Sequence, residues 1–154
     1  MLPVVLVGCG RWGLNILRDL SVLGRTAIVV DPAVEALAAA APLALATYAT
    51  FDIRESVAGV IVATPATDHV TTVEQAAVLR VPIFVEKPLA TSTQAAERAV
   101  ALTGSRLFVM EKWRYHPAIE ALGAVVRGGE LGPVRAIRTW RLAWGHSHTD
   151  VDPI

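Results

Sequence analysis

Three glycines, Gly8, Gly10 and Gly13, have the spacing G-x-G-x-x-G between a valine-rich run and the start of a helical pattern. In that context the first glycine permits a tight turn, and the second lets the backbone approach a pyrophosphate. The third lets a helix pack closely on a strand. The helix N-terminus adds unpaired N–H groups and the positive end of its dipole, and both attract phosphate. The spacing therefore predicts a dinucleotide site.

The other residues of this loop leave alternatives open. Arg11 and Trp12 are candidates to cover the dinucleotide, and an ordinary surface arginine is the alternative for Arg11. Cys9 is the single cysteine of the chain, which excludes an intrachain disulfide and a multi-cysteine zinc site. We expect Cys9 to be structural, with redox chemistry as the alternative.

Asp31 ends the next apolar run, at the distance from the glycines where an acid commonly holds the ribose hydroxyls of NAD. The alternative is an aspartate before Pro32 that starts a turn or caps a helix. A carboxylate repels a 2′-phosphate, and the next residues offer no arginine to hold one, so NAD is favoured. Arg11 leaves NADP open, because its guanidinium could reach the ribose edge.

Further polar groups follow two later apolar runs. Thr64-Pro65 comes after the first of these runs with His69 close behind, and Glu86-Lys87-Pro88 comes after the second. A compact ammonium such as that of Lys87 can stabilise negative charge developing on a carbinol or carbonyl oxygen. The alternatives are a solvated surface pair for Glu86 and Lys87, and a capping or packing role for His69.

Short apolar runs alternate with helical patterns along the whole chain, which predicts an α/β fold with a doubly wound parallel sheet. Strands are expected at 2–7, 26–30, 43–48, 59–63, 81–85 and 107–110. Helices are expected at 11–23, 33–41, 67–79, 92–103 and 117–127, with one helical turn left open at 50–57. Ligands of such sheets bind at the carboxyl ends of the strands, where the residues named above fall.

Composition narrows the class of protein. The 154 residues are 53% hydrophobic, enough for a sizeable core, and 14 basic residues balance 14 acidic ones. No basic field exists for nucleic acid or an anionic membrane surface, so neither is predicted as a partner. With one cysteine and no apolar stretch of about 20 residues, we expect a reduced, soluble, cytoplasmic protein.

The segments VGCGRWGLN, VVDP, VATPATDH and FVEKPLA together resemble the Gfo/Idh/MocA oxidoreductases. Further on, Lys112–Pro117 is similar to the family's N-x-R-x-x-P stretch, and Glu130–Val134 to its G-x-L-G-x-V entry to a second domain. The resemblance implies an NAD(P)-binding Rossmann domain, a second α/β domain, and hydride transfer at a carbon of a sugar, cyclitol or sugar nucleotide.

Carried over residue by residue, the resemblance also implies a set of site residues. Lys87 would be catalytic at the substrate hydroxyl, and Pro88, often a cis-proline in the family, would fix the loop. Arg114 would lie near the substrate side. The residues implied at the cofactor are Thr64, Pro65, His69, Glu86, Lys87, Pro88 and Arg114.

The resemblance divides the chain into a Rossmann domain at 1–118 and the start of a truncated substrate or oligomerisation domain at 119–154. That start comprises a linking helix and a strand at 134–144. We expect either disorder after about Arg127 or pairing of this strand with a second copy. The family's acid/base histidine falls beyond this strand. His146, His148, Asp150 and Asp152 are interpreted as a polar loop, with a metal site as the alternative, and no metal is assigned.

Three classes of function follow. The first, which the intact glycine motif, Asp31 and Glu86-Lys87-Pro88 favour, is an NAD(P)-dependent oxidoreductase acting on a small molecule such as a sugar. The second is a non-catalytic nucleotide-binding module, or a subunit completed by another chain. The third is an interaction protein that has lost its cofactor.

Overall fold

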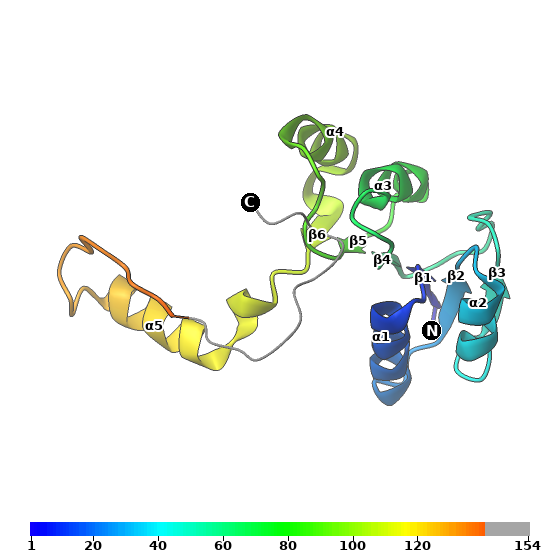
Figure 1. Ribbon diagram of the computed structural model, residues 1–154, viewed down its shortest axis with the longest axis horizontal. Coiled ribbons are helices and arrows are strands. Elements are labelled where there is room, and N and C mark those ends of the chain that lie inside the picture. Colours follow the sequence, from blue (N-terminus) through cyan, green and yellow to red (C-terminus); the bar gives the residue numbers. More distant parts are fainter. Residues whose placement is uncertain (141–154) are drawn as a thin grey trace. The chain divides into compact units, whose positions relative to one another are not determined.

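Six strands form one parallel sheet in the order β3-β2-β1-β4-β5-β6 (Figure 1). This computed structural model describes residues 1–140. The strands are β1 (Val4–Val7), β2 (Ala27–Val30), β3 (Ala46–Tyr48), β4 (Gly59–Val62), β5 (Ile83–Val85) and β6 (Leu107–Val109). Every strand predicted for this sheet is present and is shorter than its apolar run, because the flanking apolar residues continue into loops.

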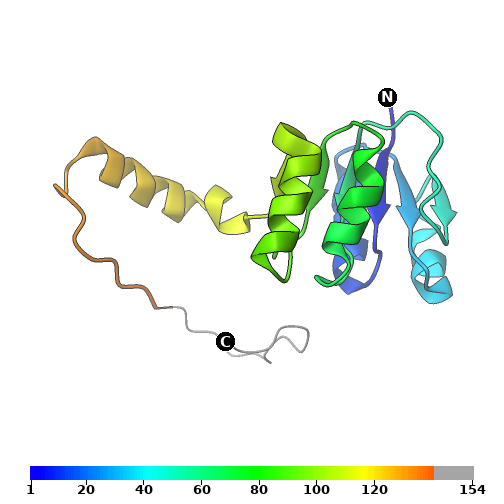
Figure 2. The ribbon, with the colours of Figure 1, turned by 90° about the horizontal axis from the view of Figure 1, so that it is seen from above.

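Four helices cover the sheet, two on each face. The helices are α1 (Arg11–Val22), α2 (Val34–Ala40), α3 (His69–Ala77) and α4 (Thr93–Thr103). In Figures 1 and 2, α1 and α2 lie on one side of the strands and α3 and α4 on the other. This is the doubly wound arrangement that the alternation of patterns predicts.

Residues 50–57 form no helical turn, in contrast to the possibility that the sequence leaves open. The crossover from β3 to β4 is irregular instead. It contributes Ile53 and Val57 to the core, and both are buried. Burial of these two apolar side chains holds this irregular crossover against the sheet.

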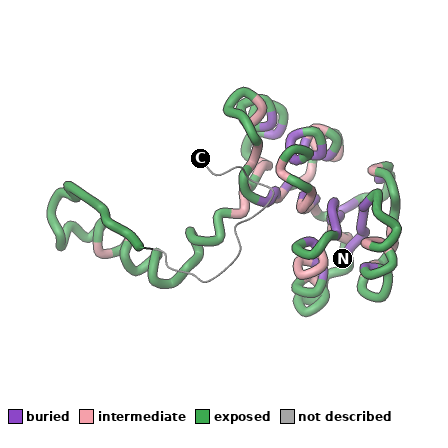
Figure 3. The backbone as a smooth tube through the Cα atoms, viewed as in Figure 1, coloured by how far each residue is buried: buried purple, intermediate pink, exposed green. Residues whose placement is uncertain are grey.

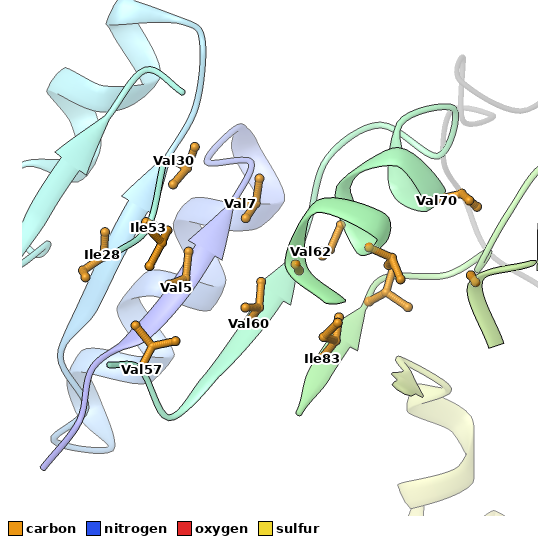
Figure 4. Packing of buried hydrophobic residues seen from close by; sticks show 14 residues of the cluster. Val5, Val7, Ile28, Val30, Ile53, Val57, Val60, Val62, Val70 and Ile83 are labelled. Carbon is orange, nitrogen blue, oxygen red and sulfur yellow. The ribbon is translucent and has the colours of Figure 1, made fainter. Parts of the chain in front are cut away.

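The core consists of two layers, one on each face of the sheet. Side chains of successive strand residues point to opposite faces, so Val5 and Val7 join one layer while Leu6 joins the other. Figure 4 shows the first layer, in which Ile28, Val5, Val60 and Ile83 follow one another across four strands. Each such side chain contributes about 1.5–3 kcal/mol when fully buried, so the sheet is a rigid base for the loops at its ends.

The chain divides into two compact units, Met1–Met110 and a second that begins at Glu111. The second contains a 3-10 helix, η2 (Lys112–Tyr115), and α5 (Pro117–Gly128). His116 caps α5 by accepting the N–H of Ala118 on Nδ1 at 3.2 Å, and Pro117 occupies the first turn. No residue from 111 to 140 is buried (Figure 3).

The strand expected at 134–144 is not seen in its described part, since residues 134–140 are in no strand. A strand needs a hydrogen-bonded neighbour, and none is paired with this segment within residues 1–140. Residues 141–144 lie outside the described residues, as do His146, His148, Asp150 and Asp152. Association through 134–144 stays a prediction.

None of the helices within residues 1–140 is long and apolar enough to cross a bilayer.

Candidate cofactor site

The site residues meet because the strands end in register. The last residues of four adjacent strands are aligned: Val30, Val7, Val62 and Val85, in sheet order. The residues directly after them are Asp31, Gly8, Ala63 and Glu86. Backbone hydrogen bonds continue across this row: Gly8 donates to Val30 at 2.8 Å, and Glu86 donates to Val62 at 2.9 Å. One edge of the sheet therefore gathers both the glycine loop and the Glu86-Lys87-Pro88 loop.

Two of the loop glycines are required by the protein's own packing. A Cβ on Gly13 would lie 2.1 Å from the carbonyl oxygen of Gly8, so only glycine lets α1 approach β1 this closely. A Cβ on Gly8 would lie 2.6 Å from the carbonyl oxygen of Ala63, and its φ of +87° is also one that favours glycine. These two positions build the turn from strand to helix.

Gly10 is different, because a Cβ added there would meet no atom of residues 1–140 within 4 Å. Gly10 is also the N-cap residue of α1, and no side chain of the described residues caps this helix end. The first N–H groups of a helix have no partners within the helix, and an anion can supply them. Open space in front of an uncapped helix N-terminus fits the pyrophosphate of a dinucleotide.

Asp31 is 8% exposed and joins two loops through its carboxylate. Its Oδ2 accepts the N–H of Cys9 at 2.7 Å, and its Oδ1 accepts the N–H of Ala33 at 2.8 Å. The bond to Ala33 closes the kind of turn that is expected where an aspartate precedes a proline. The bond to Cys9 joins positions 22 residues apart, and nothing local in the sequence indicates it. Each oxygen keeps a lone pair for a further donor.

Cys9 is 2% exposed. Burial, reinforced by the neighbouring Asp31 carboxylate, raises the pKa of its thiol. A buried thiol kept protonated has the environment of a structural cysteine and not of a reactive one.

We expect iodoacetamide to label Cys9 much more slowly in the folded chain than in urea. The thiolate is the reacting form, and a raised pKa means that it accumulates only at higher pH than in a free thiol. Mass spectrometry after timed labelling at pH 8 measures this directly, because the chain has a single cysteine. Equal rates in the two conditions would show that the thiol is accessible and of ordinary acidity.

Glu86 is 8% exposed, which rules out a solvated surface pair with Lys87. Its Oε1 accepts the indole N–H of Trp12, and its Oε2 accepts the backbone N–H of Lys87 at 3.3 Å. Trp12 stays half-exposed at 52%. The indole therefore connects the first turn of α1 to the loop after β5. The sequence carries no signal for this contact, since the two residues are 74 positions apart.

His69 begins α3 and is 1% exposed, so it is part of the interior. Its two ring nitrogens lie 2.7 Å from the carbonyl oxygen of Pro88 and 2.9 Å from that of Thr64. The hydroxyl of Thr64 is buried and has no hydrogen-bond partner among residues 1–140. This arrangement brings Thr64, His69 and Pro88 together as neighbours, with the imidazole beneath the loops.

The remaining predicted residues are exposed. Pro65 follows Thr64 in the turn before α3, and Arg11 is the first residue of α1. Lys87 is exposed, makes no ion pair within residues 1–140, and is joined to Pro88 by a cis peptide bond. Arg114 belongs to η2 in the second unit, where it is exposed.

Comparison with known proteins decides the family. The sequence pattern of GFO_IDH_MocA, described as an oxidoreductase family with an NAD-binding Rossmann fold, matches residues 2–109. This chain belongs to the Gfo/Idh/MocA family. Its first unit is the family's NAD-binding Rossmann domain, so the predicted family, fold class and cofactor are confirmed.

Individual relatives agree with this membership. The chain is 33% identical over 135 residues to the rhizopine catabolism protein MocA of Rhizobium meliloti, covering 82% of this chain and 43% of MocA. The chain thus spans less than half the length of that relative.

Solved structures share the fold. WlbA dehydrogenase from Bordetella pertussis, in complex with NADH and UDP-GlcNAcA, has a TM-score of 0.77 at 24% identity. The match covers 85% of this chain and 43% of WlbA. Scyllo-inositol dehydrogenase from Lactobacillus casei, with NAD(H) and scyllo-inositol, has a TM-score of 0.75 at 18% identity. That match covers 86% of this chain and 42% of the enzyme.

Proposed function

We propose that this chain binds NAD(H) along the carboxyl edge of its sheet and serves hydride transfer at a carbon of a sugar, cyclitol or sugar nucleotide. The observation that carries the proposal is the open space at Gly10. It lies before the uncapped N-terminus of α1, close in sequence to Cys9, which donates to Asp31, and to Trp12, which donates to Glu86.

The order of the strands supports an assignment for the two halves of the cofactor. A dinucleotide lies across the point where strand order reverses, here between β1 and β4, with one nucleotide on each half of the sheet. Asp31 follows β2 and would accept hydrogen bonds from the adenosine ribose, while the glycine loop would hold the pyrophosphate. The nicotinamide half would then lie over β4 and β5, beside Thr64-Pro65 and Glu86.

Two further residues would complete the enclosure of the cofactor. Trp12 is positioned by its bond to Glu86 and has an indole face to lay along the dinucleotide. Arg11 is exposed at the N-terminus of α1, where a guanidinium adds attraction for phosphate. Arg114 remains a proposal for the substrate side.

Lys87 is proposed as the catalytic residue. Bound NAD supplies the hydride acceptor or donor. The ammonium of Lys87 is exposed and without an ion pair within the described chain, so it is available to a substrate oxygen. Three donors on a compact charge suit an oxygen that gains negative charge as its proton leaves.

The substrate class is supported by the ligands named for the relatives' structures. UDP-GlcNAcA and scyllo-inositol are both rich in hydroxyl groups. Residues 119–154 are proposed as the beginning of a substrate or oligomerisation domain.

One observation favours a second function, that of a nucleotide-binding module or of a subunit completed by another chain. His69 is the only histidine of the first unit, and both of its ring nitrogens face carbonyl oxygens. Met1–Met110 therefore offers no unengaged imidazole to accept a proton. A nucleotide-binding module, or a subunit completed by another chain, would have this property.

The proposal predicts that NAD(H) raises the melting temperature more than NADP(H). Ligand at about 100 times its Kd stabilises a fold by about 2.7 kcal/mol. A 2′-phosphate would approach the buried Asp31 carboxylate and be repelled, so its shift should be smaller. Differential scanning fluorimetry with matched cofactor concentrations measures both.

Replacing Asp31 tests the source of that preference. Asp31→Ala and Asp31→Asn should both narrow the difference between NAD and NADP. Asp31→Asn serves as the matched variant, because its amide oxygen can still accept the N–H of Cys9 or Ala33. Equal or inverted shifts in the unmodified chain would refute the NAD preference. No shift with either cofactor would refute dinucleotide binding.

A further inference from the structure

His69 joins two loops that no other hydrogen bond connects within the described chain. One loop follows β4 and contains Thr64, and the other follows β5 and contains Pro88. The last backbone bond between these strands runs from Glu86 to Val62. Beyond it, within residues 1–140, no backbone–backbone hydrogen bond joins 64–68 to 87–90. The imidazole of His69 spans this gap, at 2.7 Å from one carbonyl oxygen and 2.9 Å from the other.

The chemistry of the two partners makes this contact directional. Carbonyl oxygens only accept hydrogen bonds, so the ring must be the donor. Either neutral tautomer donates to one carbonyl, and the imidazolium donates to both. His69 itself is 1% exposed, and both of its contacts with the carbonyl oxygens are partly buried. Removal of the ring takes away the donor that ties the two loops together, and the loss of such a hydrogen bond costs free energy.

The contact is confined to one half of the site. Thr64 and Pro88 belong to loops after β4 and β5, on the side of the sheet where the nicotinamide half would lie. The adenosine side is built separately, by Asp31 with the N–H groups of Cys9 and Ala33. Loss of the imidazole should therefore disturb one half of the cofactor site and leave the other unchanged.

We propose that His69 is a positioning residue that sets the separation between Thr64 and the Lys87-Pro88 loop, and thereby shapes the nicotinamide half of the site. The proposal rests on the proposed function, because it presumes that NAD(H) binds at this edge. From the sequence, His69 is a residue of the cofactor cleft or one that caps or packs. The ring is buried, and both nitrogens are directed to carbonyls outside α3.

The test separates the two halves of the cofactor. Dissociation constants for NADH and for ADP are measured by calorimetry on the unmodified chain, His69→Leu and His69→Gln. ADP contains the adenosine and pyrophosphate and lacks the nicotinamide half. We expect His69→Leu to weaken NADH binding by about tenfold and ADP binding by less than about twofold. The amide of His69→Gln retains a donor, so its NADH affinity should fall between the other two.

Val70→Ala is the matched control. Val70 is the next residue of α3, is 7% exposed, and packs in the apolar core. This variant should lower the melting temperature and leave the ratio of NADH to ADP affinity unchanged. A comparable change of that ratio in Val70→Ala would show that loosening α3 suffices, and would overturn the specific role of His69.

The outcomes distinguish failure of the positioning role of His69 from failure of the proposed function. If the unmodified chain binds neither NADH nor ADP, the proposed function fails. If it binds both, and His69→Leu weakens both equally or neither, the positioning role is refuted. Should both His69 variants fail to fold, ring nitrogen NMR signals of the unmodified chain decide. They should shift with NADH and not with ADP, and an unchanged spectrum with NADH overturns the proposal.

Discussion

Alanine at Gly10 should greatly weaken NAD(H) binding in a chain that still folds, whereas alanine at Gly13 should damage the fold itself. The added Cβ of Gly10→Ala meets no atom of residues 1–140 within 4 Å, so it should disturb a bound ligand and leave the fold intact. The cost of an alanine at this N-cap position is small, below about 1 kcal/mol. We expect NADH affinity to fall by about 100-fold or more, since the backbone must approach the pyrophosphate closely there.

Gly13→Ala brings a Cβ to 2.1 Å from the backbone oxygen of Gly8, where no flexible side chain can give way. Overpacking of this kind costs about 1–3 kcal/mol or more. That corresponds to a fall in melting temperature of roughly 10 °C for a domain of this size. Because α1 must shift away from β1, cofactor binding should be lost as well.

Melting curves and NADH titrations of both variants measure these effects. Gly123→Ala is the control, because the three atoms nearest to its Cβ would all belong to the end of the flexible Arg127 side chain on α5. It should change neither NADH affinity nor the melting temperature of the first unit. A Gly10→Ala chain that binds NADH as tightly as the unmodified one would show that no pyrophosphate lies against this loop.

Turnover by the chain itself should be slow, and what remains should depend on Lys87. Removing a hydride from an alcohol requires a group that takes the hydroxyl proton, and such a group contributes about 10²–10⁴-fold. His69 is engaged by two carbonyls and is unsuited to that task. Lys87→Ala should lower the residual rate by about 10²–10³-fold, the usual cost of removing one donor to a developing oxyanion.

NADH formation with aldoses, cyclitols and sugar nucleotides measures this rate. Lys87→Arg keeps the charge but changes its shape and reach, so we expect only partial activity from it. NADH affinity should change by less than about tenfold in both variants, since the pyrophosphate and adenosine contacts are untouched. A wild-type rate of about 1–10³ s⁻¹ would contradict the expected slowness. A Lys87→Ala rate equal to wild type would remove Lys87 from the mechanism.

The fold and the location of the site could be predicted from the sequence because both follow from local patterns. Valine-rich runs of four to six residues indicate buried parallel strands, and glycine spacing reports directly on backbone geometry. Parallel strands place their carboxyl ends at one edge, so the order of elements alone brings Asp31 and Glu86 near the glycine loop. The resemblance to a family then gives Lys87 its proposed role.

Contacts between distant positions were decided only by the tertiary structure. Trp12 donates to Glu86, Cys9 donates to Asp31, and His69 faces Thr64 and Pro88. Each of these contacts depends on the direction of a side chain and on the path of the loop that follows a strand. No periodic pattern in the sequence reports on either of these. The burial of individual side chains was likewise decided by the tertiary structure. The sequence left a solvated surface pair open as the alternative for Glu86 and a capping or packing role open for His69, and both residues are buried in the structure. Local chemistry therefore determines which residues reach this edge of the sheet, and packing between remote segments determines what each of them is free to bind.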